Sequence, residues 1–124
     1  MSLSGRALPW RRNIEPEPFS ITRSTHGATE IVTLEGELDM AHASEVAGLL
    51  DDLAAGENPV VVDLTSLEFI DSSGIHALVR PRSDNARIEL VCPPGNVRRV
   101  FEVTKLERVL QVHDSLDEAL AAAG

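Results

Sequence analysis

Two adjacent hydroxyl groups, those of Ser72 and Ser73, stand where an apolar stretch of the chain changes into a helix-like one. An acidic residue, Asp71, comes directly before them, and Gly74 follows directly after them. The unpaired N–H groups and the dipole at the start of a helix favour an anion there. A serine at this point is therefore predicted to cap the helix, or to carry or approach a phosphate group.

Nucleophilic catalysis is a second chemistry that these residue types allow. Ser72 and His76 are four residues apart, so on a helix they could share one face, and Asp39 or Asp71 could complete a triad. A nucleophilic serine needs a base within hydrogen-bond distance and a group that stabilises the oxyanion. The turn lacks the Gly-x-Ser-x-Gly pattern of serine hydrolases. We therefore expect no enzyme, and we predict that His76 is a surface residue at a partner contact.

Metal and cofactor chemistry has little support in the residues. The four histidines are scattered and the chain has one cysteine, so no Cys/His spacing suits a metal ion. Asp63 and Asp71 could be compared with phosphate-accepting aspartates, but such sites also use a lysine, and Lys105 is the only one. No Gly-rich phosphate loop is present. We predict no metal and no cofactor, and we expect Cys92 to be a packed strand residue.

The elements around the two serines can be predicted from local patterns. Val60–Asp63 is an apolar, β-branched run of the kind that forms a buried parallel strand, and Leu67–Ile70 is a second apolar patch. The run from Ile75 to Val79 is helix-like. Pro81 removes a backbone donor and disfavours helical geometry at Arg80. The helix after the serines is therefore predicted to end near Val79 or to kink.

Further elements lie on both sides of this stretch. Segments 19–25 and 29–35 are predicted to form a hairpin around His26-Gly27. A helix is predicted over 41–55, with Val46, Leu49, Leu50 and Leu53 as its apolar stripe and Asp39 as its cap. Asn96 is predicted to cap a helix that buries Val97, Val100 and Phe101, and Ser115 with Glu118 forms a capping box for the last helix.

Three parts of the chain together form a recognisable pattern: Val61–Leu64 followed by Phe69–Gly74, then Gly36–Asp39, and Val97–Glu102. This pattern resembles the STAS domain, and most closely the bacterial anti-sigma-factor antagonists. The resemblance extends over about residues 19–123. The family usually has glycine where Lys105 stands, and a lysine in the left-handed conformation costs roughly 1 kcal/mol. We therefore expect the turn at Lys105 to be built differently.

The resemblance implies a fold and a domain organisation. We expect a single α/β domain of the STAS type over residues 19–124. Its mixed sheet of four or five strands should be covered mainly on one face by three or four helices. The helices that start near Ala41 and Ser73 should be neighbours.

The resemblance also implies a function, that of a non-enzymatic switch. When unphosphorylated, such a protein binds an anti-sigma factor, typically a serine kinase of the histidine-kinase-like ATPase fold, and frees a sigma factor. The kinase phosphorylates the serine that matches Ser72, with Ser73 as the fallback acceptor, and a serine phosphatase restores the hydroxyl. The implied partner-binding residues are Asp39, Asp71, Ser72, Ser73, Gly74 and His76. Other STAS modules are scaffolds in signalling complexes or subunits of lipid-transport machines, and these remain alternatives.

The net charge of −9 is distributed unevenly along the 124 residues. Between Arg23 and Arg80 the chain has no Lys or Arg, whereas eleven acidic residues lie from Glu30 to Asp71. Nucleic acids are bound by basic patches and aromatic platforms, and both are scarce here, so we expect no direct nucleic-acid binding. The acidic surface is expected to keep the domain soluble or to steer a partner.

The ends and the apolar runs of the chain bear on its location. No apolar run approaches the roughly 18 residues of a membrane-spanning helix, so no membrane span is expected. A single cysteine fits a reducing compartment, and we expect a cytoplasmic protein. Residues 1–18 carry three prolines and few apolar side chains, which predicts a flexible N-terminal arm. Trp10 in this arm could dock on the domain or on a partner.

Overall fold

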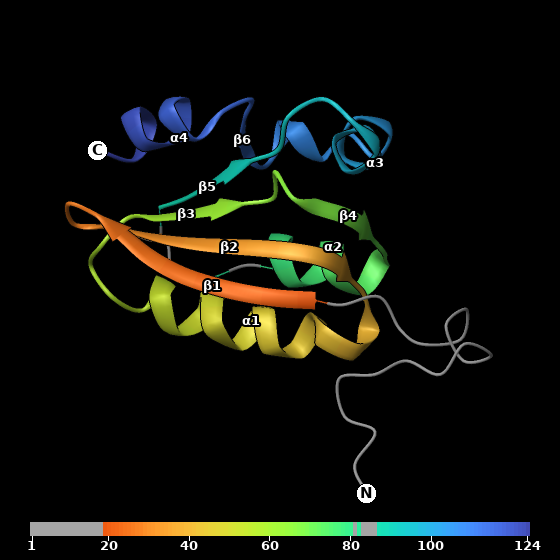
Figure 1. The fold of residues 1–124 in the computed structure, drawn as a ribbon, viewed down its shortest axis with the longest axis horizontal. Helices are drawn as coiled ribbons and strands as arrows, with labels where there is room; N and C mark the ends of the chain where they lie inside the picture. The colour runs from red at the N-terminus through yellow and green to blue at the C-terminus, as the bar shows by residue number, and fades with distance from the viewer. Residues whose placement is uncertain (1–18, 81, 83–86) are drawn as a thin grey trace, which may run out of the picture.

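The computed structural model describes residues 19–80, Arg82 and residues 87–124, and the predicted N-terminal arm of residues 1–18 lies outside this part. The described residues form six strands, four α-helices and a short 3₁₀ helix (Figure 1). In chain order these are β1 (Phe19–His26), β2 (Thr29–Leu38), α1 (Met40–Ala54), β3 (Val60–Asp63), β4 (Leu67–Ile70), α2 (Ser72–Val79), β5 (Ile88–Val91), α3 (Asn96–Val103), the 3₁₀ helix (Leu106–Arg108), β6 (Gln111–His113) and α4 (Leu116–Ala123).

The strands form one mixed sheet in the order β1-β2-β3-β5-β6. β1 and β2 are the predicted antiparallel hairpin, with Gly27 at a positive φ of 62° in the turn. All the other pairs are parallel, and β4 joins the sheet by pairing with β2 beyond the end of β3. The sheet has six strands because Leu67–Ile70, expected only as an apolar patch, pairs with β2 along Gly36–Leu38.

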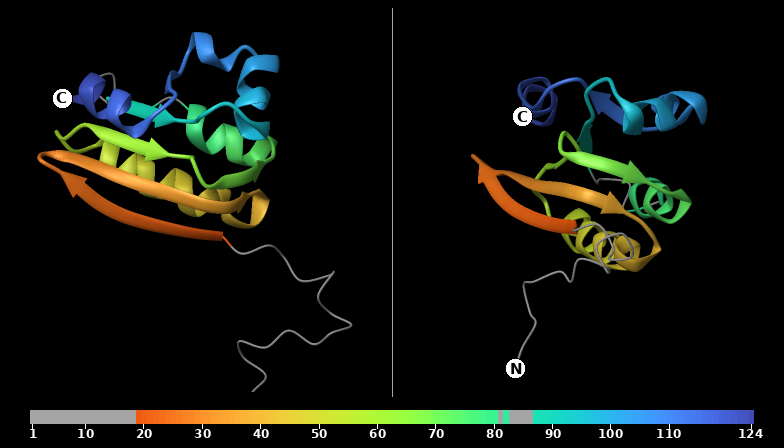
Figure 2. Two further views of the ribbon diagram at one scale, coloured as in Figure 1. Left: turned by 45° about the horizontal axis from the view of Figure 1, so that its top comes forward. Right: turned by 45° about the vertical axis from the view of Figure 1, so that its right-hand side comes forward.

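Helices cover both faces of this sheet (Figure 2). The buried residues Val32, Val62 and Leu90 point toward the face where α1 and α2 pack, and Phe101 of α3 joins the same apolar cluster. The alternate residues point the other way. Ile31, Val61 and Val91 form a smaller cluster with Ala119 and Ala123 of α4. Successive strand residues face opposite sides, which is why a continuous valine run is needed in β3.

Local geometry corrects two predictions in the C-terminal half. Lys105 does adopt the left-handed conformation, with φ 61° and ψ 23°, so the expectation of a differently built turn was wrong. Asn96 is the first residue of α3 and not its cap; Gly95 occupies the cap position and makes no side-chain bond. At the last helix Ser115 is confirmed as the cap, because its hydroxyl accepts from the Glu118 N–H at 3.2 Å.

Candidate functional site

Two helices, α1 and α2, begin side by side at the C-terminal ends of β2 and β4. Leu38 of β2 and Ile70 of β4 are paired in parallel register, and each strand ends there. The next residue in each case is an aspartate that caps a helix. Asp39 accepts from the Ala41 N–H at 3.0 Å, as predicted, and Asp71 accepts from the Gly74 N–H at 2.9 Å. The prediction that Ser72 or Ser73 caps the second helix was therefore wrong, because the carboxylate of Asp71 takes that N–H group.

Gly74 holds the start of α2 close to the end of β2. A Cβ atom at this position would lie 2.7 Å from the Leu38 carbonyl oxygen and 2.8 Å from side-chain carbons of Leu38 and Ile70. Any larger residue would push the helix away from the sheet. Gly74 is buried, so it sets the position of the two serines and does not itself offer a surface to a partner.

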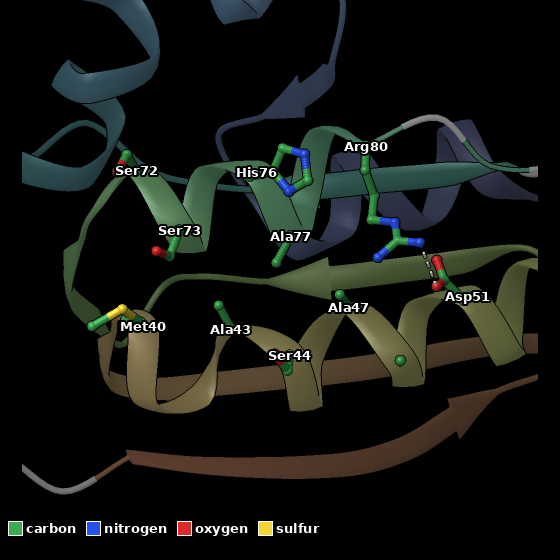
Figure 3. A pocket seen from close by; sticks show the side chains of 11 residues that line it. Met40, Ala43, Ser44, Ala47, Asp51, Ser72, Ser73, His76, Ala77 and Arg80 are labelled. Atoms are coloured by element: carbon green, nitrogen blue, oxygen red, sulfur yellow. Dashed lines mark ion pairs between the residues drawn. The ribbon is translucent and has the colours of Figure 1, made fainter.

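The two serine hydroxyls lie at the end of a groove between α1 and α2 (Figure 3). Ser72 is exposed and Ser73 is half-buried, with its side chain pointing toward α1. The helices were predicted to be neighbours, and this is confirmed by the groove that they share. Its volume is about 520 Å³, and its lining residues are Met40, Ala43, Ser44, Ala47, Gly48, Asp51, Ser72, Ser73, His76, Ala77 and Arg80.

The far end of the groove is closed by ion pairs between α1 and the segment after α2. Asp51 of α1 binds Arg80 at 3.2 Å and Arg82 at 2.9 Å. The Arg82 guanidinium also donates to the carbonyl oxygens of Ala77 at 2.7 Å and Arg80 at 3.2 Å. Burial lowers the pKa of Arg82, and the Asp51 carboxylate opposes this shift. The arginine thus caps the C-terminus of α2 and ties that helix to α1.

The helix that carries the serines ends where the proline predicts. α2 stops at Val79, and Arg80 has an extended ψ of 144°, so the expected end near Val79 is confirmed. Pro81 itself, like residues 83–86, lies outside the described residues.

The serine–histidine pair that a hydrolase would need is not formed. His76 is exposed on α2 and lines the same groove as Ser72, but these two side chains stand apart (Figure 3). Within the described part of the chain, neither serine hydroxyl makes a hydrogen bond. The described residues also contain no group of three His, Cys, Asp or Glu side chains that could hold a metal ion.

Besides three alanines and Gly48, four groove residues were not indicated as site residues by the sequence. Met40 is the first residue of α1 and is 77% exposed, which is unusual for a large apolar side chain. An apolar residue directly after a capping aspartate was the signal that could have indicated it. Ser44, Asp51 and Arg80 had no local signal, because their place in the groove depends on how α1 packs beside α2.

Comparison with protein-family models matches residues 20–119 to the STAS domain. The chain belongs to the STAS domain family. Both the resemblance noted in the sequence and the α/β fold expected from it are thereby confirmed. None of the described helices of this STAS domain is long and apolar enough to cross a membrane.

Proteins similar to this STAS domain include anti-sigma factor antagonists. RsfB of Mycobacterium tuberculosis, an anti-sigma-F factor antagonist, is 23% identical over 85% of this chain and 89% of RsfB. Rv2638 of the same organism, named as a candidate anti-anti-sigma factor, is 31% identical over 84% of this chain and 77% of Rv2638. The crystal structure of an anti-sigma factor antagonist from Mycobacterium paratuberculosis matches with a TM-score of 0.77 at 24% identity, covering 86% of this chain and 94% of that one.

Proposed function

We propose that this STAS domain is an anti-sigma-factor antagonist that is switched by phosphorylation. With a free hydroxyl at Ser72 it binds an anti-sigma factor that is also a serine kinase of the histidine-kinase-like ATPase fold, and so releases a sigma factor for transcription. The kinase transfers a phosphoryl group to Ser72, and a serine phosphatase removes it. The domain itself acts by binding and not by catalysis.

The observation that carries the proposal is the position of Ser72. Its side chain is exposed, directly follows the helix cap Asp71, and lies at the end of a groove that a partner can enter. Ser73 shares the groove but is half-buried and points toward α1, so Ser72 is the more accessible acceptor. The similarity to anti-sigma factor antagonists supports the proposed antagonist function.

Electrostatics explain how a phosphate would act as a switch. A phosphoserine carries about −1.5 to −2 charges at neutral pH. At Ser72 it would stand beside the Asp71 carboxylate. The Gly74 N–H at the start of α2 already donates to that carboxylate. The dipole of α2 offsets part of this repulsion. A partner surface shaped for a neutral hydroxyl would face a bulky dianion, and binding would be lost.

Two linked experiments test this proposal. Wild-type protein, Ser72→Ala and Ser73→Ala are each incubated with the candidate anti-sigma kinase and ATP, and mass spectrometry locates the phosphate. We expect phosphate on the wild type and on Ser73→Ala, and none on Ser72→Ala. Full labelling of Ser72→Ala at Ser73 would move the acceptor by one residue. If no anti-sigma factor of the source organism binds the unphosphorylated protein in calorimetry, the proposed function is wrong.

A further inference from the structure

The outer side of β1 is an unpaired strand edge. β1 is the last strand on its side of the sheet, and among the described strands only β2 pairs with it (Figure 1). Its eight residues pair with β2 without a bulge and include no lysine, proline or acidic residue. Bulges, lysines, prolines and short length are the devices that usually keep strand edges from associating. The opposite edge strand, β6, has only three residues, so β1 is the edge that can accept a further strand.

The backbone groups that β1 leaves free follow from the hydrogen bonds of β2. The N–H groups of Gly36 and Glu30 donate to carbonyl oxygens outside β1, so both point away from it. In an antiparallel pair, opposite residues exchange two hydrogen bonds or none. Phe19, opposite Gly36, and Thr25, opposite Glu30, therefore stand at positions that exchange none with β2. By alternation, the N–H and C=O groups that point outward are those of Phe19, Ile21, Arg23 and Thr25.

The hydroxyl side chains of β1 are arranged symmetrically about Thr22. Ser20 precedes it by two residues and Ser24 follows it by two, so all three side chains point to the same face of the strand. All three are exposed. When two copies of β1 run antiparallel with a two-fold axis at Thr22, this row meets itself. Thr22 then lies opposite Thr22 of the second copy, and Ser20 lies opposite Ser24. Hydroxyl pairs of this kind across antiparallel strands are stabilising.

The outward-pointing backbone groups fit the same register. Ile21 lies opposite Arg23 of the second copy, and Phe19 lies opposite Thr25, so these residues exchange about eight backbone hydrogen bonds across the axis. On this face the half-buried Ile21 is covered by the aliphatic stem of the opposite arginine. An axis at Arg23 would place two arginines opposite each other, which is destabilising. An axis at Ile21 would leave Thr25 without an opposite residue in β1.

The charge of the chain favours β1 as the place where two copies meet. The net charge of −9 makes copies repel one another, but β1 itself contributes no carboxylate to this repulsion. Its single arginine, Arg23, pairs with Glu30 of the neighbouring strand at 3.1 Å. The edge of β1 therefore brings neither unpaired arginine nor acidic side chains to the two-fold axis.

We propose that this STAS domain forms a symmetric homodimer in which the β1 strands of two copies pair antiparallel about Thr22 and join the two sheets into one. The interface is a narrow strip along one strand, and interfaces below about 1,200 Å² belong to weak, reversible complexes. The dimer is therefore in exchange with the monomer. β1 contributes no residue to the groove between α1 and α2, so this inference does not depend on the proposed function.

Sedimentation equilibrium of the full chain tests the dimer and its axis. The average mass of the wild type should rise from one chain toward two between about 10 µM and about 1 mM. Thr22→Lys and Thr22→Asp each place like charges opposite one another and should each weaken association at least about tenfold. An equimolar mixture of these two variants should associate at least as strongly as the wild type, because an ammonium group then faces a carboxylate. The matched control, Ala122→Lys on the exposed side of α4, should not weaken association.

Disulfide trapping tests the register. Thr22→Cys places a thiol on the axis, at a non-hydrogen-bonded pair whose Cα atoms lie about 4.5 Å apart, so mild oxidation should link two copies. Cys92 is buried and does not compete. The control Ser24→Cys should stay unlinked, because the two Ser24 positions lie about 14 Å apart along the strands. Ser24→Cys mixed with Ser20→Cys should link. A wild type that stays monomeric up to about 1 mM, association that ignores the charges at Thr22, or equal linking of Thr22→Cys and Ser24→Cys would each overturn the proposal.

Discussion

Asp39 and Asp71 occupy equivalent positions at the ends of two parallel strands: each follows one member of the Leu38–Ile70 pair, and each caps the next helix. This relationship makes α1 and α2 begin side by side. It also places the exposed Met40 and Ser72 directly after the two caps, at the same end of the parallel strands. The register of one strand pair therefore sets where the proposed acceptor meets the groove.

The first prediction separates the cap of α2 from the proposed acceptor. Asp71→Ala removes the oxygen that accepts from the Gly74 N–H, and it should lower the free energy of unfolding by about 0.5–2 kcal/mol. Ser72→Ala removes an exposed hydroxyl and should change that free energy by less than about 0.5 kcal/mol. Urea denaturation measures both. Equal destabilisation by the two changes would show that Ser72 contributes to the cap after all.

The second prediction concerns the close contact at Gly74. Gly74→Ala places a methyl group 2.7 Å from the Leu38 carbonyl oxygen, and overpacking of this kind costs typically about 1–3 kcal/mol. Gly48→Ala, where nothing lies within 4 Å of an added Cβ atom, is the control and should be neutral or stabilising. The measurement is again the free energy of unfolding. A Gly74→Ala variant as stable as the wild type would mean that the start of α2 can move away from β2 without cost.

The strand at the centre of the sheet and the end of α2 could be predicted because their causes are local. Three consecutive valines, Val60 to Val62, make a run that stays buried on both faces, and Pro81 limits the preceding helix wherever the sheet lies. The α1 stripe was only partly right. Val46 and Leu50 are fully buried, as expected, but Leu49 and Leu53 are only half-buried, and small alanines complete the buried face: Ala43, Ala47 and Ala54.

Two features could not be predicted from local preference. Lys105 accepts a left-handed conformation that costs about 1 kcal/mol, although glycine would be favoured there. Arg82 acts as the C-terminal cap of α2 only because Asp51 on another helix holds its guanidinium. No spacing within the chain could have indicated a bond between residues 31 positions apart.

The third prediction tests Arg82 as the tie between α1 and α2. Its side chain is only 6% exposed, and it donates to Asp51 and to carbonyl groups at the end of α2. Arg82→Ala should therefore cost about 1–3 kcal/mol, because charge-assisted bonds are lost and buried carbonyls are left unpaired. Arg80→Ala is the matched control: its side chain is 42% exposed, and the loss should stay below about 1 kcal/mol. Equal effects in thermal or urea denaturation would contradict this assignment.

The fourth prediction uses the buried thiol of Cys92, which is 2% exposed. Burial raises its pKa to about 11 from an ordinary value of 9.0. Well below pH 9 the thiol is protonated in both the folded and the unfolded chain, so stability does not depend on it. As pH rises from about 9 to 11 the unfolded chain loses the proton first, so the folded state loses stability, on the order of 2 kcal/mol.

Denaturation of the wild type and of Cys92→Ala over this pH range measures the effect. The wild type should lose more stability than the variant between pH 9 and 11, after the cavity cost of the variant at neutral pH is subtracted. At pH 8 the native thiol should also react far more slowly with a thiol reagent than the urea-unfolded chain does. Rapid reaction of the native protein would show that Cys92 is accessible.

The last prediction concerns the step of partner binding on which phosphorylation acts, and it rests on the proposed function. Eleven acidic residues and no Lys or Arg lie between Glu30 and Asp71, so a partner steered to this side should be basic there. At long range an added phosphate would slightly speed association, within a screening length of about 8–10 Å. At contact range the phosphate stands beside Asp71, and burying it without a basic pocket costs several kcal/mol.

The contact effect should dominate, because interface changes act mostly on dissociation, whereas steering changes association by only a few decades. We therefore expect phospho-Ser72, and more weakly Ser72→Asp, to raise the dissociation rate from the kinase-type partner, with association unchanged or slightly faster. Stopped-flow kinetics at two salt concentrations measure both rates, and Ser44→Asp, in the same groove but on α1, controls for added charge alone. If both forms dissociated equally fast and the whole loss lay in association, long-range repulsion would be the operative effect, and the partner surface could not be basic.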